Sequence, residues 1–308
     1  MNIFEYINQQ IVLNNTTFVP SSDSIELICH TTGSSQTLTL DNIAVADGEI
    51  VTIYWGDGDS DACSGEGMRR HVYAVAGLYT IRITNYTALT KLYTDDYKIS
   101  GVIGGWVLWE GLTYLNLLNT SIDGDIGNWI LPSTLENLYL ESTAVLGDIS
   151  GWVLPAGLVN LIIDNTAVSG DIGSWVLPAT LENLWISETP VSGDITSWVI
   201  PAALIRLYLF FTLVEGAPDM TSAVAIQSYL IANCGLAEAD VDAILAGIYA
   251  RRTSFTAAAP ELEIDGTNDA PSGLYQDATP PTTGNEYKFK LQTDPDTEGF
   301  NVWDITAN

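Results

Sequence analysis

The chain has 308 residues, of which 38 are Asp or Glu and 10 are Lys or Arg, so its formal net charge is −28. So negative a chain is a poor partner for nucleic acid or an anionic membrane surface, because both attract clustered basic residues. Apolar residues make up 47% of the chain, so a sizeable core can form and extensive disorder is not expected. No run of 18 apolar residues occurs, and we expect no membrane insertion.

Residues 1–22 are predicted to form an N-terminal arm. Phe4, Ile7 and Ile11 would share one face of a helix and could dock onto another subunit, and a disordered terminus is the alternative. The opening stretch MNIFEYINQQIVLNN has no basic region and no uninterrupted apolar segment. The sequence therefore predicts no signal peptide here.

Cysteine and histidine are too rare for the commoner metal sites and catalytic mechanisms. Cys29, Cys63 and Cys234 are too scattered for a disulfide framework or a zinc site. A Cys29–Cys63 bridge is the alternative to free buried thiols, which we favour. The two histidines, His30 and His71, precede the repeats described below, and His71 is expected to pack against a turn.

Residues 23–98 are predicted to form a small antiparallel β-sandwich, since short β-rich segments alternate there with turn residues. The expected strands are Ser24–His30, Gln36–Leu40, Ile50–Tyr54 and Tyr79–Thr84. Three motifs follow one another in this region: W-G-D-G at 55–58, H-x-Y at 71–73 and G-x-Y-T-I at 77–81. Together they resemble the PKD-like domain family, which implies an immunoglobulin-like sandwich that serves as a spacer or adhesion module without catalysis.

Alternating acids in the same region raise the question of calcium. Asp57, Asp59 and Asp61 have the spacing that begins an EF-hand loop, but that loop needs Gly at its sixth position and Glu at its twelfth. Ala62 and Met68 occupy those positions, so an EF-hand is excluded. A looser Ca²⁺ site on the three acids is the weaker alternative to a structural role for Asp57 in the turn, and no other cofactor is expected.

Residues 99–220 contain a 23-residue repeat with the unit L-x-x-L-x-L/I-x-x-T-x-V/I-x-G-D-I-x-x-W-V-L-P. The recurring tryptophans are Trp106, Trp129, Trp152, Trp175 and Trp198. Self-similarity at this period is typical of a solenoid whose turns bury one another's apolar residues. The unit resembles the leucine-rich repeat family, with Thr where that family usually has Asn or Cys, which implies a stacked coil with a parallel sheet.

The recurring side chains are expected to be structural. A buried tryptophan stack is favoured over a sugar-binding ladder, and Trp-Val-Leu-Pro should place the indole and two aliphatic side chains in the far wall. The Thr column should satisfy backbone groups of the adjoining loop. A column of Asp residues should cap turns rather than chelate Ca²⁺. These acids are Asp125, Asp148, Asp171 and Asp194.

Function is therefore expected where the turns differ and side chains point outward from the repeat strands, on a sheet predicted to be concave. The candidate ligand-binding residues are Tyr114, Tyr139, Glu141, Asp164, Trp185, Arg206, Tyr208 and Phe210. Aromatic faces beside acids and amides suit a glycan or a protein loop. The alternative is that these are ordinary exposed strand residues.

Residues 221–270 are predicted to close the solenoid with two helices, Thr221–Cys234 and Ala237–Arg252, and a strand at Leu262–Asp265. Residues 271–308 are predicted to form a β-hairpin tail, with strands at Tyr287–Leu291 and Phe300–Ile305.

The C-terminal region also carries the motifs D-G-T-N-x-A-P-S-G and Y-Q-D-A-T-P-P-T-T-G. They resemble the endings of leucine-rich-repeat proteins found among bacteriophage structural proteins and bacterial surface proteins. The resemblance implies a place on a particle or a cell surface.

The predicted fold class is mainly β with a small α cap. An enzyme is not expected, because no catalytic motif occurs and a pair such as Glu141 and Asp164 would lie on an open sheet without enclosure. We expect a non-enzymatic structural or attachment protein of a tailed-phage virion: a tail fibre, tail tip or capsid decoration. It would contact other virion or surface subunits and a host-surface glycan or protein. A bacterial secreted or cell-surface leucine-rich-repeat adhesin is the alternative.

Overall fold

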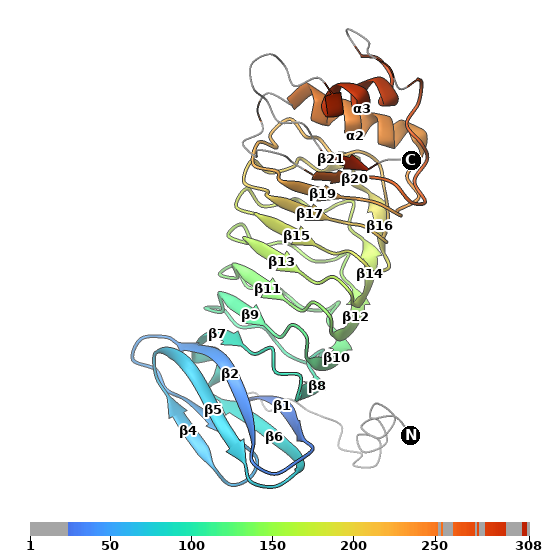
Figure 1. The fold of residues 1–308 in the computed structure, drawn as a ribbon. Coiled ribbons are helices and arrows are strands. Elements are labelled where there is room, and N and C mark those ends of the chain that lie inside the picture. Colours follow the sequence, from blue (N-terminus) through green and yellow to red (C-terminus); the bar gives the residue numbers. More distant parts are fainter. Residues whose placement is uncertain are drawn as a thin grey trace.

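The computed structural model describes residues 24–251, 254, 261–274, 276, 281–293 and 304–306. Figure 1 shows a rod with a β-rich unit at one end and two helices at the other. The structure is mostly β, as predicted. The predicted arm over residues 1–22 lies outside the described residues.

Two sheets run through the described part of the molecule. The ten-stranded sheet has the spatial order β18 (Leu213–Glu215), β16 (Val191–Asp194), β14 (Ala167–Asp171), β12 (Ala144–Asp148), β10 (Ser121–Asp125), β8 (Ile99–Val102), β1 (Ser24–Thr31), β6 (Gly77–Thr84), β3 (Val51–Tyr54) and β4 (Ser60–Cys63). The eleven-stranded sheet has the order β21 (Asp304–Thr306), β20 (Glu261–Glu263), β19 (Ser228–Leu230), β17 (Arg206–Tyr208), β15 (Asn183–Trp185), β13 (Asn160–Ile162), β11 (Asn137–Tyr139), β9 (Tyr114–Asn116), β7 (Leu89–Tyr93), β2 (Gln36–Val45) and β5 (Glu66–Tyr73).

The N-terminal unit is a two-layered β-sandwich. In one layer β6 pairs antiparallel with β1 and β3, and β3 pairs with β4; in the other, β2 pairs antiparallel with β5 and β7. Trp55 and Tyr73 are fully buried between the layers, and the Tyr73 hydroxyl donates to the Trp55 carbonyl at 2.8 Å. The four predicted strands agree with β1, β2, β3 and β6, although β2 continues to Val45 through a bulge.

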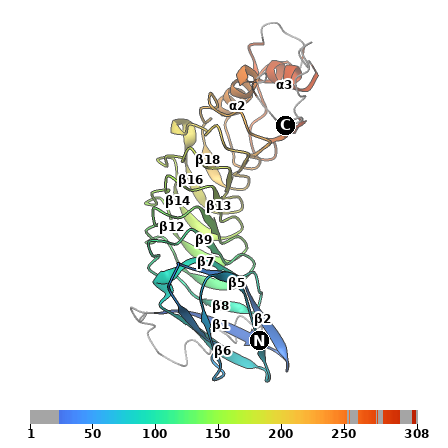
Figure 2. The same cartoon turned by 90° about the vertical axis from the view of Figure 1, so that its left-hand side faces the viewer.

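The sandwich continues into the solenoid without a break in either sheet. Strand β8 pairs antiparallel with β1 and parallel with β10, and β7 pairs antiparallel with β2 and parallel with β9. The sandwich therefore covers the first solenoid turn on both sides. Figure 2 shows β12, β14, β16 and β18 following one another along one side of the rod.

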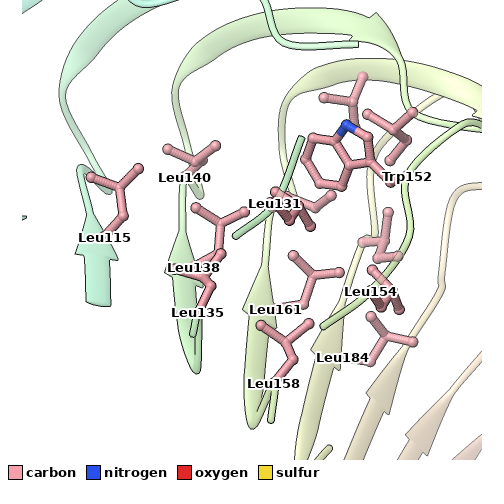
Figure 3. Packing of buried hydrophobic residues seen from close by; sticks show 14 of the residues in the cluster. Leu115, Leu131, Leu135, Leu138, Leu140, Trp152, Leu154, Leu158, Leu161 and Leu184 are labelled. Carbon is pink, nitrogen blue, oxygen red and sulfur yellow. The ribbon is translucent and has the colours of Figure 1, made fainter. Parts of the chain in front are cut away.

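Each solenoid turn adds one parallel strand to each sheet, and the structure has about six turns at a spacing of about 23 residues. In the eleven-stranded sheet the pairing joins equivalent residues: Leu115, Leu138 and Leu161 are successive partners in β9, β11 and β13. All three side chains are fully buried and point into the coil, as Figure 3 shows. The middle residue of each short strand therefore faces the core, and the residues on either side of it face outward.

The tryptophan column is buried, as predicted. The five side chains are between 1% and 5% exposed, and the indole N–H groups of Trp152 and Trp198 donate to the carbonyls of Ile126 and Ile172. The prediction that both aliphatic residues after each Trp enter the far wall was wrong, because only the second of them is buried. In the turn of Trp129, Leu131 is 8% exposed whereas Ile130 is 85% exposed. Alternate residues of an extended segment point to opposite sides, so the residue between Trp and Leu points to solvent.

The Asp and Thr columns cap turns, as predicted. Each Asp Oδ1 accepts the backbone N–H two residues later, at 2.9 Å for Asp148 and 2.8 Å for Asp171, and hydrogen bonds from Ser150 hold the pKa of Asp148 below its usual value. Each Thr hydroxyl donates to the carbonyl three residues earlier, at 2.6 Å for Thr143 and 2.7 Å for Thr166. Both columns satisfy backbone groups at the corners of the coil.

The predicted helix Thr221–Cys234 is instead a further solenoid turn. Its strand β19 pairs parallel with β17, and Tyr229 takes the place of the inward leucine opposite Leu207. The apolar residues that suggested a helical stripe, such as Ile226 and Ile231, are fully buried inside this turn. Periodicity alone could not distinguish a helix from a solenoid turn here, because both bury closely spaced apolar residues.

The predicted second helix is present as α2 (Glu238–Arg251), but the C-terminal β-hairpin was wrong. The segment predicted as the strand Tyr287–Leu291 lies within helix α3 (Gly284–Thr293), which packs on α2. Glu286 accepts the backbone N–H of Thr283 at 3.2 Å, the reciprocal contact typical of a helix N-terminus. Of the segment Phe300–Ile305, the described part begins β21, which pairs parallel with β20.

No described helix is long and apolar enough to cross a bilayer.

Gly170 shows how tightly the turns stack. Its φ is +115°, and a Cβ there would collide with the Asp148 carboxylate of the preceding turn. We therefore expect Gly170→Ala to lower the free energy of unfolding by about 2 kcal/mol, measured by urea denaturation. Gly151→Ala is the matched control, because a Cβ at Gly151 meets no atom within 4 Å and its φ is not positive. Equal midpoints for the two variants would contradict this account of the corner.

Candidate ligand-binding face

The eight predicted site residues lie on one face, the outward side of the eleven-stranded sheet between β9 and β17. Tyr114, Tyr139, Trp185, Arg206 and Tyr208 are strand residues in outward positions. Glu141, Asp164 and Phe210 each follow their strand by two residues. All eight are half-buried.

An asparagine ladder occupies one outward column of this face. Asn160 Nδ2 donates to Asn137 Oδ1 at 2.7 Å, and Asn183 Nδ2 donates to Asn160 Oδ1 at 2.7 Å. Arg206 Nη1 donates to Asn183 Oδ1 at 3.2 Å and closes the ladder. One N–H group of Arg206 is therefore already hydrogen-bonded within the protein. The ladder was not predicted from the sequence, although asparagine at one register in three successive turns was a signal for it.

Three tyrosines form an aromatic cluster at the sandwich end of the face. Tyr93 and Tyr114 have ring centroids 6.3 Å apart, and Tyr114 and Tyr139 have centroids 5.5 Å apart. Burial raises the pKa of Tyr139 to about 12, so its hydroxyl stays protonated at neutral pH. Tyr93 was not among the predicted residues, but it lies one repeat before Asn116 and two before Tyr139, and counting back would have found it.

A second aromatic cluster lies toward the C-terminal end of the face. Trp185 and Tyr208 are stacked, with centroids 4.9 Å apart and planes 22° apart. Phe210 lies 6.5 Å from Tyr208, and Phe211 lies 6.0 Å from Phe210. Phe211 is 58% exposed and has a φ of +54°, at the corner position that Asn, Ser or Glu fills in the earlier turns. That departure from the repeat was the sequence signal for Phe211, which was not predicted.

Ile162 connects the two clusters. It pairs with Tyr139 on one side and Trp185 on the other, in an outward position, and yet it is only 3% exposed. The aromatic side chains on either side must therefore cover it. We call the row of apolar side chains that results the aromatic strip. It consists of Tyr93, Tyr114, Tyr139, Ile162, Trp185, Tyr208, Phe210 and Phe211.

Polar atoms without partners lie beside the middle of this strip. Asp164 Oδ1, Trp185 Nε1 and Ser187 Oγ are buried and have no hydrogen-bond partner among the described residues. The Ser142 N–H donates to the Asp164 carbonyl and the Asn165 N–H donates to the Ser187 carbonyl, so Asp164 lies between Ser142 and Ser187 of the neighbouring turns. An unpaired buried polar group costs about 1–3 kcal/mol, so each of these three groups would gain from a hydrogen-bonding partner.

Burial raises the pKa of Asp164 to about 6, and the charges of Glu141 and Glu188 add to the effect. Asp164 can therefore act as a hydrogen-bond acceptor at neutral pH and as a donor in mildly acidic solution. Glu141 and Asp164 are close enough to interact electrostatically, but both belong to the outer surface of the sheet.

In the sandwich, the acids predicted as weak calcium ligands separate into two groups. Asp57, Asp59 and His71 have potential ligand atoms within 4.8 Å of one another, and His71 Nε2 lies 2.7 Å from Asp57 Oδ2. Asp61 instead accepts the indole N–H of Trp55 at 3.0 Å. The His71 ring stacks on Trp55 with centroids 5.0 Å apart, in agreement with the packing role predicted for it.

All three cysteines are free thiols. Cys29 and Cys63 are both buried in the sandwich, and burial raises the pKa of Cys29 to about 12. The Cys29–Cys63 bridge that the sequence left open is therefore absent.

No protein-family model and no curated protein matches the chain. The likeness to leucine-rich repeats, PKD-like domains and phage proteins thus rests on the sequence motifs themselves.

The raised pKa of Asp164 gives the stability of the protein a defined pH dependence. The folded chain binds this proton more tightly than the unfolded chain, so this group's contribution to stability falls as the pH rises from about 4 to about 7. We expect Asp164→Asn to remove that contribution and to raise the free energy of unfolding at pH 7 by on the order of 1–3 kcal/mol.

The measurement is urea denaturation at several pH values. Glu182→Gln, which removes an exposed carboxylate near the same sheet, is the charge-matched control. An Asp164→Asn profile parallel to that of the wild type would contradict the burial and charge environment described here.

Proposed function

We propose that the protein is a non-enzymatic binding protein whose aromatic strip takes an extended glycan. The observation that carries the proposal is the succession of aromatic side chains along the outward face, in one cluster from β7 to β11 and a second from β15 to β17. Aromatic faces pack against the apolar faces of sugar rings, and each turn of the coil adds a further position about 4.8 Å along the rod. A polymer of several sugar units matches such a surface better than a small molecule does.

The unpaired polar atoms support a ligand with hydroxyl groups. Trp185 Nε1 can only donate a hydrogen bond, ionised Asp164 can only accept, and Ser187 Oγ can do both. A hydroxyl group both donates and accepts, so a sugar can pair with groups of each of these kinds. Glu141, Asp164 and Glu188 disfavour a glycan with carboxylate or sulfate groups, because like charges would lie close together.

A protein loop is the second candidate ligand. Phe211 favours it, because a phenyl ring that is 58% exposed beside other aromatic residues is typical of the anchor positions of protein interfaces. The acids Glu141 and Asp164 support no hydrolytic function, since a pair on the outer surface of a sheet lacks the enclosure that glycoside hydrolysis requires.

Binding to a glycan array tests the proposal. We expect Trp185→Ala and Tyr208→Ala each to weaken binding of the selected oligosaccharide by about tenfold or more, because the stacked pair loses one platform. The control is Tyr97→Ala, which removes a tyrosine that is 73% exposed and lies outside the strip. Equal binding by all three variants, or reducing ends released from the bound oligosaccharide, would contradict the proposal.

We further propose that this surface acts on a tailed-phage particle, as a tail or capsid component. The support is the resemblance of the C-terminal motifs at 265–273 and 275–284 to the endings of phage structural proteins. Mass spectrometry of purified particles is the test. Peptides of this chain at a constant ratio to the major structural protein are expected, whereas recovery on bacterial cell envelopes alone would favour the adhesin alternative.

A further inference from the structure

A second face of the solenoid carries none of the residues of the aromatic strip. It is formed by the segments that return from the ten-stranded to the eleven-stranded sheet, and its centre is the residue between Trp and Leu of each repeat. We call the row of these side chains the aliphatic ridge. It consists of Val107 (75% exposed), Ile130 (85%), Val153 (82%), Val176 (83%) and Val199 (54%).

One exposed valine needs no explanation, but five in register do. Successive members occupy equivalent positions in adjacent turns, so they lie about 4.8 Å apart and the ridge is about 19 Å long. Ala156, Ala179 and Ala202 are exposed in the same segments and widen the apolar surface. The coil does not require an aliphatic residue at an outward position, since any polar residue could stand there.

The face that carries the ridge has few charged residues. The four segments 126–135, 149–158, 172–181 and 195–204 contain no Asp, Glu, Lys, Arg or His, in a chain whose net charge is −28. The segment of Val107, residues 103–112, has one charged residue, the exposed Glu110. The remaining exposed side chains of the four uncharged segments are small or neutral, such as Asn128, Ser174 and Thr180. An apolar centre with a polar rim and few charges is the composition of an interface core.

The missing charges also limit what the face can bind. Apart from Glu110 at one end of the ridge, a charged partner would find no counter-charge in these segments, so electrostatic complementarity favours a surface that is itself largely uncharged. A row of side chains at one fixed spacing interlocks best with a second row of the same spacing. A second copy of this chain provides both, because it carries the same largely uncharged face and the same ridge.

We propose that two copies of the chain associate through their aliphatic ridges, antiparallel and about a two-fold axis. In such an isologous contact the central residue of each ridge meets its own equivalent, and the first residue meets the last. Val153 is the central member, so it lies against Val153 of the other copy, and Val107 lies against Val199. The β-branched side chains are already restricted in rotation, so ordering them costs little entropy.

The contact is expected to be weak and favoured by salt. A ridge about 19 Å long covers less than the roughly 800 Å² per partner of a standard interface, so we expect dimers at micromolar rather than nanomolar concentrations. The exposed Asp column, including Asp125 and Asp148, precedes these segments in each turn. Added salt screens repulsion between the columns of the two copies and should strengthen the dimer.

Sedimentation equilibrium of the full chain tests the association, at protein concentrations from about 1 µM to about 1 mM. We expect reversible dimers whose dissociation constant rises at least about tenfold in the double variant Val153→Asp/Val176→Asp. The matched control is Leu146→Asp/Leu213→Asp, which adds the same charge at aliphatic residues that are 45% and 64% exposed on the ten-stranded sheet. All four sites are exposed, so the variants should fold.

Cysteine cross-linking tests the geometry. Under mild oxidation Val153→Cys should link to itself, whereas Val107→Cys should link to Val199→Cys and not to itself. The wild-type chain controls for the half-buried Cys234. A chain that is monomeric at about 1 mM, a dimer weakened equally by the control variant or by salt, or efficient self-linking of Val107→Cys would each overturn the proposal.

Discussion

The rest of the structure depends on one constraint, the parallel pairing of each short strand with its equivalent 23 residues later. Leu115, Leu138 and Leu161 are fully buried because each lies against its own counterpart in the neighbouring turn. The same stacking of turns also aligns each of the remaining positions of the repeat in a column. All residues of a column share one environment over several turns. A whole column therefore forms a buried stack, a ladder of hydrogen bonds or an exposed row. The two faces to which we assign binding roles are both products of this geometry.

The ends of the coil solve a different problem, because a stacked turn without a neighbour exposes apolar residues and unpaired strand edges. At the N-terminal end, β7 and β8 each pair parallel with the solenoid on one side and antiparallel with the sandwich on the other. The change of direction occurs within the sheets, so no separate capping element is needed there. At the other end, the cap includes α2 and α3 together with β20 and β21, which extend the eleven-stranded sheet.

The sequence predicted what repeats better than what occurs once. The buried tryptophans and the capping roles of Asp148 and Thr143 followed from their period, because a residue kept in every turn is most simply part of the scaffold. Tyr229 was misassigned to a helix, since a single atypical turn offers no period with which to compare it. The alternation of inward and outward positions along each strand identified the outward residues, but it did not predict which of their side chains contact one another. The link from Arg206 to Asn183, and the burial of Ile162 between larger neighbours, depend on side-chain contacts across turns.

The seam between neighbouring turns is nearly the same from β10 to β16, since each step pairs a residue with the one 21 positions later. A gene that gained or lost one unit of 23 codons in this region would join the same surfaces again and leave both ends intact. The reach of the molecule can thus change in increments of about 4.8 Å while its tips stay as they are. The length of such a chain can therefore change by inheritance while the structures at its two ends stay the same.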